Sequence, residues 1–573
     1  MTYTDRYNKW LNSEVIDEET KQQIRNMTED EKELSFFKEL EFGTAGLRAI
    51  MGIGTNRMNK YTIVKTTEGV ANYILKKGFE NRSAVIAYDS RHNSKEFAET
   101  AALVLNKRNI KTYIFDSLMS TPVLAYACLF LKTSVGINIT SSHNAKEYNG
   151  YKIYNSEGHQ FTSPEDTEIM NEINSIDEYP HIDLTDISVM IEKGLFNYVD
   201  DEVLESFVKE TKQQIKKRYD DNRNLKIVYT ALHGTGTKLM ARILNEVGFV
   251  NVYNVLEQRY PDADFKTTPY PNPEDLSTFD IAIEVARKKD ADIIIASDPD
   301  ADRVGIMVKS DYGEYIPLSG NQVGALIGSY VLSNTENLSN GVIIRSIVTG
   351  KLIDAVATDY NIKVEEVYTG PKYIGEKIAE YDKTGENKYI FGFEESIGYL
   401  VGNYVRDKNG FSAALVFCEL CEVLKDHGIG ILEYLEDFYK KYGYYSDKSF
   451  SVEYDGIDAM DQMAAIMDRV RESHLTSIGS YNINTIEDFL SGEAYHCRDD
   501  TYSDIEFPPS NVLRFTLEDG SWFAIRPSGT EPKIKVYMEA IDTSQEISLK
   551  KLEEIEKGIK NLIKWGIENE LQR

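Results

Sequence analysis

Residues 138–144, with the sequence NITSSHN, bring two adjacent hydroxyl groups and a histidine together in a polar stretch of the chain. Apolar residues alternate at positions 135–139, and an extended-looking pattern resumes at 151–154, so the polar stretch is predicted to be a loop between two strands. A loop just after a strand is a common place for a reactive side chain. Ser141 and Ser142 are therefore both candidate nucleophiles, and the local pattern does not choose between them.

The segment 292–308, DIIIASDPDADRVGIMV, is the most specific local signal in the sequence. A strand of the buried type leads directly into three carboxylates at a spacing of two residues: Asp298, Asp300 and Asp302. Carboxylates this close repel one another without a cation, and hard oxygen ligands suit Mg²⁺, or Mn²⁺ or Ca²⁺, rather than zinc. An EF-hand loop also begins with this spacing, but it needs glycine and glutamate where this chain has Arg303 and Lys309. A solvated acidic turn is the remaining alternative, and the apolar strand before the loop favours a metal site instead.

Three further segments have the composition of phosphate-binding loops. The segment 522–537, WFAIRPSGTEPKIKVY, places four such residues between two strand-like runs: Arg526, Ser528, Gly529 and Thr530. Arginine offers a planar fork for phosphate, hydroxyl groups add donors, and glycine lets backbone N–H groups approach an anion. Residues 42–48 (FGTAGLR) and 231–238 (ALHGTGTK) have similar ingredients. Each of the three could equally be a simple turn, and none matches the P-loop that binds nucleoside triphosphates.

Residues 391–401, FGFEESIGYLV, place carboxylate and hydroxyl groups after another strand-like run: Glu394, Glu395 and Ser396. These groups could contact the hydroxyl groups of a sugar or decorate a turn, and composition leaves the two interpretations nearly even. Residues 367–375, VYTGPKYIG, give a weaker signal of the same kind. Residues 88–94, YDSRHNS, fit either a helix cap or a contact to an anion.

The elements that must position these residues follow one repeated order: a short β-branched run, a turn rich in glycine, serine, threonine or aspartate, and an amphipathic stretch. The order begins near residues 83, 225, 291 and 341. Strands that alternate with helical patterns predict parallel α/β units, in which ligands bind beyond the strand ends. From about Tyr445 the strands are scattered and lead to a helix-like C-terminal segment, which predicts a smaller α+β domain.

The composition narrows the classes of function. At 573 residues the chain is long enough for about four domains of roughly 150 residues each. Its 93 acidic against 64 basic side chains give a formal net charge of -29, which argues against a nucleic acid or an anionic membrane as partner. No apolar signal-peptide core or bilayer-spanning run is visible, and four cysteines are too few for a disulfide framework. We expect a soluble, cytoplasmic protein in which Cys418 and Cys421 are buried thiols one helical turn apart.

Taken together, the segments resemble the α-D-phosphohexomutase superfamily. Five motifs of that family occur here in its order: F-G-T-[AS]-G-L-R at 42–48, T-A-S-H-N at 140–144, D-x-D-x-D-R at 298–303, G-E-x-S in form at 394–396, and R-P-S-G-T-E-P at 526–532. They cover nearly the whole chain, whose length is similar to that of the longer branch with bacterial phosphoglucomutases and phosphopentomutase-like relatives. Three departures are small: Ser141 replaces the usual alanine, Pro371 lies beside Lys372 where an aromatic residue is common, and Asn409 stands where the usual motif has Asp.

The resemblance implies that Ser142, rather than Ser141, carries a phosphoryl group in the resting enzyme. The phosphoserine would donate this group to a sugar monophosphate, and the resulting 1,6-bisphosphate would turn and return its other phosphate. The resemblance also implies one Mg²⁺ per chain, held by the three aspartates and Ser142, with glucose 1,6-bisphosphate as activator. We expect interconversion of glucose 1-phosphate and glucose 6-phosphate, with phosphomannomutase or phosphopentomutase activity by the same mechanism as the alternative.

The same resemblance assigns roles to the other site residues. His143 and Lys152 are the expected general acid and base, in an order the sequence leaves open, and Arg48 would neutralise charge near the transferring group. The expected substrate-binding residues are Arg303, Thr369, Gly370, Lys372, Glu394, Ser396, Lys408, Arg526, Ser528, Gly529 and Thr530.

The implied fold is α/β, with three similar mixed α/β sheet domains and a C-terminal α+β domain around a central cleft. The predicted boundaries are 1–205 with the phosphoserine loop, 206–315 with the metal loop, 316–440 with the sugar-binding loop, and 441–573 with the phosphate-binding loop. The expected partner is a sugar phosphate, with no nucleic acid or membrane, and the expected assembly is a monomer or homodimer.

Two other classes of function remain as alternatives: a phosphomonoesterase, which sustained release of inorganic phosphate would reveal, and a non-catalytic sugar-phosphate sensor. A sensor would not need the serine and the three aspartates together.

Overall fold

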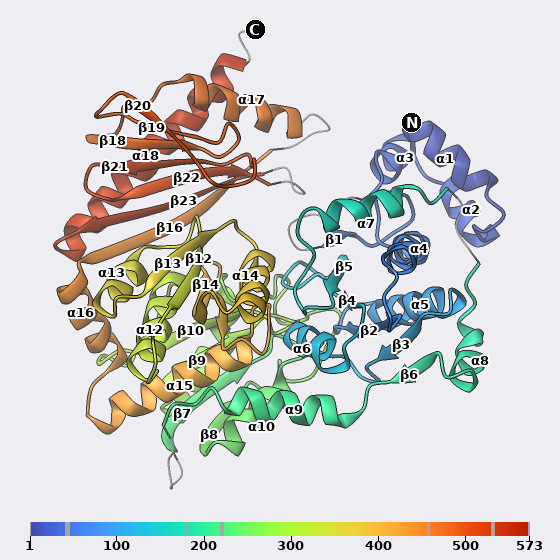
Figure 1. The fold of residues 1–573 in the computed structure, drawn as a ribbon, viewed down its shortest axis with the longest axis horizontal. Coiled ribbons are helices and arrows are strands. Elements are labelled where there is room, and N and C mark those ends of the chain that lie inside the picture. The colour runs from blue at the N-terminus through green and yellow to red at the C-terminus, as the bar shows by residue number, and fades with distance from the viewer. Residues whose placement is uncertain are drawn as a thin grey trace. The chain divides into compact units, whose positions relative to one another are not determined.

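The computed structural model describes residues 2–40, 46–177, 181–217, 223–454, 459–528 and 533–570 (Figure 1). The chain forms two compact units. One consists of Met1–Ser346 and Tyr360–Ile431, and the other of Ile347–Asp359 and Leu432–Arg573.

Three short helices begin the first unit: α1 (Tyr3–Asn12), α2 (Glu18–Arg25) and α3 (Glu29–Phe36). The side chains of Thr2, Asp17 and Thr28 each accept a hydrogen bond from a backbone N–H of the first turn, which fixes where the three helices start. Trp10 and Phe36 meet edge to face in a small apolar cluster that joins these helices to the following part of the chain.

The first sheet has six strands in the order β1-β5-β4-β2-β3-β6. They are β1 (Leu47–Ile50), β2 (Ser83–Tyr88), β3 (Lys111–Ile114), β4 (Val135–Ile139), β5 (Tyr148–Asn155) and β6 (Phe196–Tyr198). Strands β4, β2, β3 and β6 are parallel, whereas β5 is antiparallel to both β4 and β1. The accompanying helices are α4 (Lys60–Lys77), α5 (Ser94–Lys107), α6 (Thr121–Leu131), α7 (Glu165–Asn174), η1 (Leu184–Asp186), α8 (Ile187–Glu192) and α9 (Asp201–Lys212).

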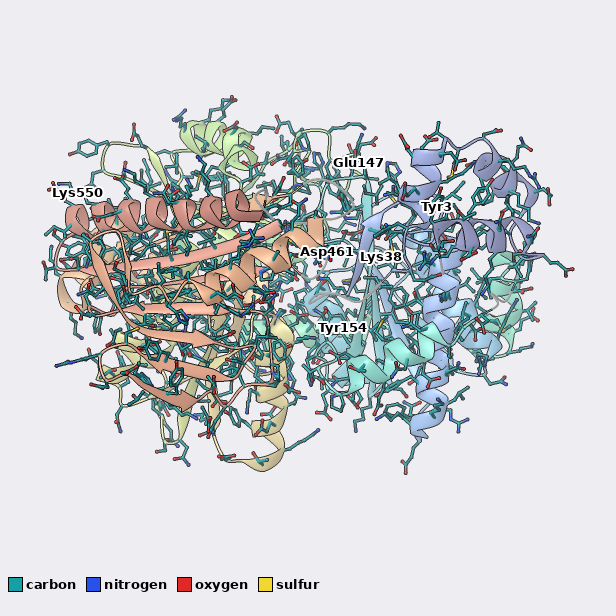
Figure 2. All side chains as sticks on the ribbon, turned by 90° about the horizontal axis from the view of Figure 1, so that it is seen from above. Tyr3, Lys38, Glu147, Tyr154, Asp461 and Lys550 are labelled. Atoms are coloured by element: carbon teal, nitrogen blue, oxygen red, sulfur yellow. The ribbon has the colours of Figure 1, made fainter. Side chains whose placement is uncertain are left out.

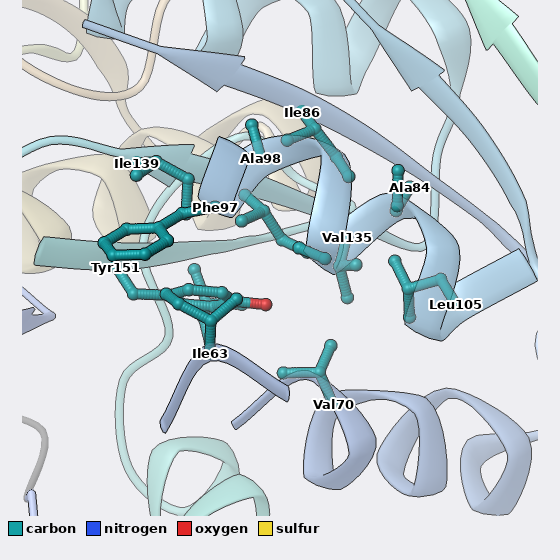
Figure 3. Close-up of a cluster of buried hydrophobic side chains, with 14 of the residues drawn as sticks. Ile63, Val70, Ala84, Ile86, Phe97, Ala98, Leu105, Val135, Ile139 and Tyr151 are labelled. Atoms are coloured by element: carbon teal, nitrogen blue, oxygen red, sulfur yellow. The ribbon is translucent and has the colours of Figure 1, made fainter. Parts of the chain in front are cut away.

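Helices cover both faces of this sheet. Val135, Ile137 and Ile139 point from β4 into an apolar core shared with α4 and α5, part of which Figure 3 shows. Because successive residues of a strand point to opposite faces, Gly136 faces α6. A Cβ atom at that position would collide with the sulfur of Cys128, so the glycine allows α6 to pack closely. These contacts give the buried, largely parallel sheet expected of an α/β unit.

The first unit contains two more mixed sheets. The second has the order β11-β10-β9-β7-β8 and the third the order β13-β12-β14-β15. The second sheet and its helices are β7 (Arg223–Thr230), α10 (Thr237–Glu246), β8 (Phe249–Asn254), η2 (Leu276–Phe279), α11 (Asp280–Lys289), β9 (Ile293–Ser297), β10 (Val304–Lys309) and β11 (Tyr315–Leu318). The third sheet and its helices are α12 (Gly320–Ser333), β12 (Gly341–Ser346), β13 (Lys363–Val367), α14 (Pro371–Thr384), β14 (Lys388–Glu394), β15 (Gly398–Val401) and α15 (Gly410–Asp426).

The second unit is an antiparallel sheet with helices. Its strands pair in the order β16-β23-β22-β21-β18-β19-β20, and β17 pairs with β18. The elements are α13 (Leu352–Asp359), α16 (Ile431–Tyr442, whose first residue belongs to the first unit), β16 (Tyr444–Glu453), α17 (Ala459–Glu472), β17 (Ser477–Ile478), β18 (Tyr481–Asp488), β19 (Glu493–His496), β20 (Thr501–Asp504), β21 (Leu513–Leu517), β22 (Trp522–Pro527), β23 (Lys533–Asp542) and α18 (Gln545–Glu570). Helix α18, on which Figure 2 labels Lys550, runs along the sheet, and Ile555 and Ile559 pack with α17 and the strands in one core.

The predicted fold class is confirmed, because three mixed α/β sheets are followed by a C-terminal part that is mostly strands. The domain boundaries given above stay predictions. The sequence pattern missed β17 to β20 and α17. Cys418 and Cys421 lie buried on α15, as expected. Within the described ranges, every helix is too short or too polar to cross a lipid bilayer.

Candidate active site

Ser142 lies in the loop that follows β4, and its backbone has a φ of 52°, in the left-handed region that non-glycine residues rarely adopt. Its side chain is buried, and its hydroxyl donates to Asp298 Oδ2 at 2.7 Å. The Nδ1 atom of His143 lies 3.2 Å from the same hydroxyl oxygen. The hydroxyl of Ser141 is also buried but has no hydrogen-bond partner among the described residues. The geometry thus places Ser142, and not Ser141, against the acidic loop.

Arg91 holds the loop that contains Ser142 (the serine loop) by donating hydrogen bonds to the peptide carbonyls of that loop. The guanidinium donates to the carbonyl oxygens of Ser142 and Asn144, both at 2.6 Å, and to those of Ala145 at 2.7 Å and Tyr148 at 3.1 Å. Asp89 Oδ2 accepts from Arg91 Nε at 3.1 Å. Sequence reasoning left residues 88–94 as a helix cap or an anion contact and missed this contact to the loop.

The three predicted acidic residues are buried and lie together. Asp298, Asp300 and Asp302 each offer an oxygen, and these oxygens lie within 4.8 Å of one another. Burial, followed by the charges of the other two carboxylates, raises the pKa of Asp298 well above its ordinary value. The Oδ1 atoms of Asp300 and Asp302 are buried and accept no hydrogen bond within the described part of the chain. Buried carboxylate oxygens without a donor fit a hard cation, so the residues present suit Mg²⁺.

Two lysines reach this acidic group from other sheets. Lys152 on β5 places Nζ 2.7 Å from Asp300 Oδ2 and 3.4 Å from Asp302 Oδ2. Burial alone would lower the pKa of Lys152, but the two carboxylates outweigh it and hold that pKa above its ordinary value. Lys408, between β15 and α15, lies 3.1 Å from Asp302 Oδ2. The hydroxyl of Tyr154, which Figure 2 labels, donates at 2.8 Å to the neighbouring Asp407.

The predicted sugar-binding loop lies beside the metal loop. Glu394 ends β14 in a buried position, and its Oε1 accepts from the backbone N–H of Gly370 at 2.6 Å. Burial raises the pKa of Glu394, although the positive charge of Lys408 opposes this shift. Ser396 lies in the following turn, and the carbonyl of the next residue, Ile397, accepts from Val304 N at 3.1 Å.

The remaining predicted residues of the first unit differ in their contacts. Arg48 on β1 donates from Nη1 to Asn144 Oδ1 at 3.0 Å. Arg303 Nη1 lies 3.2 Å from Glu274 Oε2. The hydroxyl of Thr369 is buried without a hydrogen-bond partner among the described residues, and Lys372 Nζ lies 3.4 Å from Asp166 Oδ2.

The predicted phosphate loop belongs to the second unit. Arg526 lies on β22, and Ser528 follows this strand, donating its backbone N–H to the carbonyl of Lys533 at 2.9 Å. Gly529 and Thr530 lie outside the described residues, as do positions 42–45 of the N-terminal FGTAGLR segment.

The ALHGTGTK segment supports the metal loop. Thr235 donates its backbone N–H at 2.8 Å and its hydroxyl at 2.9 Å to the carbonyl of Pro299. A Cβ atom on Gly234 would collide with the Pro299 backbone, which explains the glycine there. Among the three segments with the composition of a phosphate loop, this one packs against the loop that carries the aspartates.

The chain is similar to known proteins along most of its length. Models of the phosphoglucomutase/phosphomannomutase family match in chain order: alpha/beta/alpha domain I at residues 39–180, domain II at 205–313, domain III at 319–442 and the C-terminal domain at 461–556. The chain is 36% identical over 532 residues to the phosphoglucomutase of Staphylococcus epidermidis, with 93% of this chain and 96% of that relative covered. This chain belongs to the phosphoglucomutase/phosphomannomutase family. The phosphoglucomutase of Staphylococcus aureus is 37% identical over 512 residues, with 89% of this chain and 91% of the relative covered.

Solved structures of the family share the fold. A phosphoglucomutase/phosphomannomutase family protein from Burkholderia thailandensis aligns with a TM-score of 0.65 and 16% identity, covering 92% of this chain and 97% of that one. Parafusin, a phosphoglucomutase from Paramecium solved in an open form, aligns with a TM-score of 0.66 and 18% identity, covering 93% and 95%. The family resemblance inferred from the five motifs is confirmed by the four family models and by the relatives at 36–37% identity.

Proposed function

We propose that this family member is a phosphoglucomutase that interconverts glucose 1-phosphate and glucose 6-phosphate through a phosphorylated Ser142 and glucose 1,6-bisphosphate. One observation carries the proposal: the Ser142 hydroxyl lies 2.7 Å from Asp298 within a buried cluster of three carboxylates. The names of the bacterial relatives at 36–37% identity support the choice of glucose.

The cation in this proposal is one Mg²⁺ per chain, held by Asp298, Asp300, Asp302 and the phosphorylated Ser142. When bound, it would stabilise negative charge on the transferring phosphoryl group. The Oδ1 atoms of Asp300 and Asp302, which accept no hydrogen bond from any described residue, support this assignment. The proposal includes glucose 1,6-bisphosphate as activator, because it restores the phosphoserine when the intermediate escapes.

The reaction moves one phosphoryl group in each direction. The bond between phosphorus and Ser142 Oγ breaks, and the free sugar hydroxyl bonds to the phosphorus and loses its proton to the protein. After the bisphosphate turns, the other phosphoryl group passes to Ser142 Oγ, and the freed sugar oxygen receives a proton. Positioning and charge stabilisation supply most of the catalysis in such transfers. His143, whose Nδ1 lies 3.2 Å from Ser142 Oγ, and Lys152 are proposed to move these protons.

The other residues are proposed to bind substrate. Arg48 and Arg303 neutralise charge near the transferring group, and Glu394 and Ser396 contact the sugar hydroxyl groups. The proposed contacts to the phosphate that does not transfer come from Arg526, Ser528, Gly529 and Thr530. The remaining proposed contacts come from Thr369, Gly370, Lys372 and Lys408. We also propose that the protein is a monomer or homodimer in the cytoplasm.

The test is a coupled dehydrogenase assay for glucose 6-phosphate, with glucose 1-phosphate, Mg²⁺ and a trace of glucose 1,6-bisphosphate. We expect turnover by the wild type, a loss of at least about 10³-fold in Ser142→Ala, and activity close to wild type in the matched control Ser141→Ala. Mannose and ribose 1-phosphates run in parallel, and faster turnover of either would replace glucose in the proposal. Full activity of Ser142→Ala would refute the phosphoserine assignment, and steady release of inorganic phosphate would indicate a phosphatase.

A further inference from the structure

The metal loop accepts hydrogen bonds at three successive carbonyls. The carbonyl of Pro299 accepts from Thr235 N at 2.8 Å, that of Asp300 from Thr121 N at 2.9 Å, and that of Ala301 from Gly410 N at 3.2 Å. Thr235 precedes α10, Thr121 begins α6 and Gly410 begins α15. These three helices accompany three different sheets of the first unit. The backbone of the loop is therefore fixed from three sides.

Thr121 also binds the loop through its side chain. Its hydroxyl donates to Asp300 Oδ2 at 2.6 Å. The same hydroxyl oxygen accepts from Asn138 Nδ2 at 2.7 Å. Because the amide of Asn138 occupies a lone pair, the single hydroxyl proton of Thr121 is directed to the carboxylate. Both Thr121 and Asn138 have 0% exposure, so water does not compete for these bonds.

The two carboxylate oxygens of Asp300 differ in their hydrogen bonds. Oδ2 accepts from Thr121 and from Lys152 Nζ, whereas Oδ1 is buried without a donor in the described part of the chain. The terminal torsion of an aspartate is broad, so the side chain has little intrinsic preference for one rotation of its carboxylate. Two donors on Oδ2 remove this freedom and leave Oδ1 for a cation.

We propose that Thr121 is a positioning residue of the metal site, which fixes the rotation of Asp300 so that Oδ1 faces the cation. Asn138 lies on β4, the strand that leads to Ser142, so the same contacts set the distance between the metal loop and the serine. The inference rests on the cation site of the proposed function. Partners of this kind, which touch a ligand rather than the metal, typically change metal affinity by about 10- to 100-fold when removed.

Thr121→Val tests the inference because it keeps the shape and the backbone N–H but removes the hydroxyl. Mn²⁺ binding to EDTA-treated, full-length protein is measured by calorimetry and by electron paramagnetic resonance. We expect Thr121→Val to weaken Mn²⁺ binding at least about tenfold and Thr121→Ser to restore it to within about threefold of wild type. At saturating Mg²⁺, the KM for glucose 1-phosphate should stay within about twofold of wild type in Thr121→Val, which a general loss of structure would not allow.

Thr133→Val is the matched control, since Thr133 is equally buried just beyond the other end of α6 and should leave Mn²⁺ affinity unchanged. Should Thr121→Val fail to fold, Asn138→Leu carries the test, with an expected weakening of Mn²⁺ binding of about tenfold. The inference is overturned if folded Thr121→Val binds Mn²⁺ as tightly as the wild type. If Thr121→Val does not fold, the same result for Asn138→Leu overturns it. Mn²⁺ binding that depends on Thr121 in a protein inactive on sugar phosphates would refute the proposed function and leave the inference standing.

Discussion

Arg91 is a buried cation whose partners are mostly peptide carbonyls. Four carbonyls between positions 142 and 148 accept from its two terminal nitrogens, and the guanidinium carbon lies 5.0 Å from the centre of the Phe265 ring. The loop that it holds contains Ser142 with a positive φ, a conformation that costs about 1–3 kcal/mol and persists only where the surroundings impose it. The planar fork of arginine can impose it, since it presents several donors in fixed directions at once.

Replacement of Arg91 by lysine keeps the charge and removes the fork. A lysine ammonium cannot reach four carbonyls, so we expect the serine to move and kcat to fall by about 10- to 100-fold, with KM for glucose 1-phosphate nearly unchanged. Steady-state kinetics in the coupled assay measure both values. Arg287→Lys, at an exposed position on α11, is the control. Equal kcat in the two variants would show that Arg91 does not position the serine.

Local sequence was enough to single out the three aspartates and the pair Ser141 and Ser142, because each group lies in one short segment after a strand, whereas the choice of Ser142 came from the family resemblance. Arg91 and Thr121 could not be found in this way. Arg91 contacts Ser142 across 51 positions, and Thr121 contacts Asp300 across 179. Contacts between residues so far apart in the sequence depend on how the sheets pack, and the residues around either position do not predict them.

At the scale of elements, the ALHGTGTK turn, whose composition left a phosphate contact or a simple turn open, packs closely against the metal loop. Gly234 approaches the Pro299 backbone so closely that any side chain would displace one of the two segments. The φ of Gly234 lies outside the left-handed region, so the glycine is needed for space and not for backbone conformation. The position of the aspartates therefore depends on a residue that has no side chain.

Gly234→Ala should push the metal loop away from the turn. We expect a loss of about 1–3 kcal/mol of stability, which is typical of overpacking, together with at least tenfold weaker activation by Mg²⁺. Thermal unfolding and Mg²⁺ titrations of activity measure the two effects. Gly430→Ala is the control, because a Cβ there meets nothing within 4 Å and its φ is also outside the left-handed region. The packing argument fails if the two variants unfold alike and respond to Mg²⁺ alike.

Two of the strands that sequence reasoning missed have weak periodicity, although the missed helix α17 has the regular burial of an amphipathic helix. Every residue of β20 is exposed, and β18 has only one buried position, so neither strand shows the alternation of a half-buried strand. By contrast, β4 and β9 are buried throughout and follow the expected apolar runs. The C-terminal sheet was thus only partly predictable, whereas the strands that carry the site were found because they lie in a core.

At the scale of the whole molecule, an acidic chain places several buried or largely buried cations close to the site. The formal net charge is -29, yet Arg91, Lys152, Lys408 and the largely buried Arg303 all lie beside the serine or metal loops. Such a cluster can attract a doubly charged sugar phosphate despite the charge of the surface, since buried charges are screened less by salt. Net charge alone therefore does not exclude an anionic substrate.

His159, in the segment after β5, lies beside α14 and is held neutral. Nε2 accepts from the side-chain amide of Asn155 at 3.1 Å, and Nδ1 donates to the carbonyl of Gln160 at 2.9 Å. A Cβ atom on Gly375 of α14 would collide with the carbonyl oxygen of Arg406 and would lie 2.7 Å from the Cβ of His159, so this glycine makes room for both residues. Burial lowers the pKa of His159 to about 4, and the side chain is 5% exposed.

This lowered pKa predicts a loss of stability in mild acid. In the unfolded chain, His159 takes up a proton below its ordinary pKa of about 6.5, whereas the folded protein resists protonation down to about 4. Unfolding is therefore favoured as the pH falls through this window, by about 2 kcal/mol at pH 5 relative to pH 7.5. We expect His159→Gln to remove this contribution, so that its apparent Tm falls by roughly 2 °C less than that of the wild type between these pH values. His427→Asn, at an exposed position, should keep the wild-type dependence, and an unchanged dependence in His159→Gln would contradict the assignment.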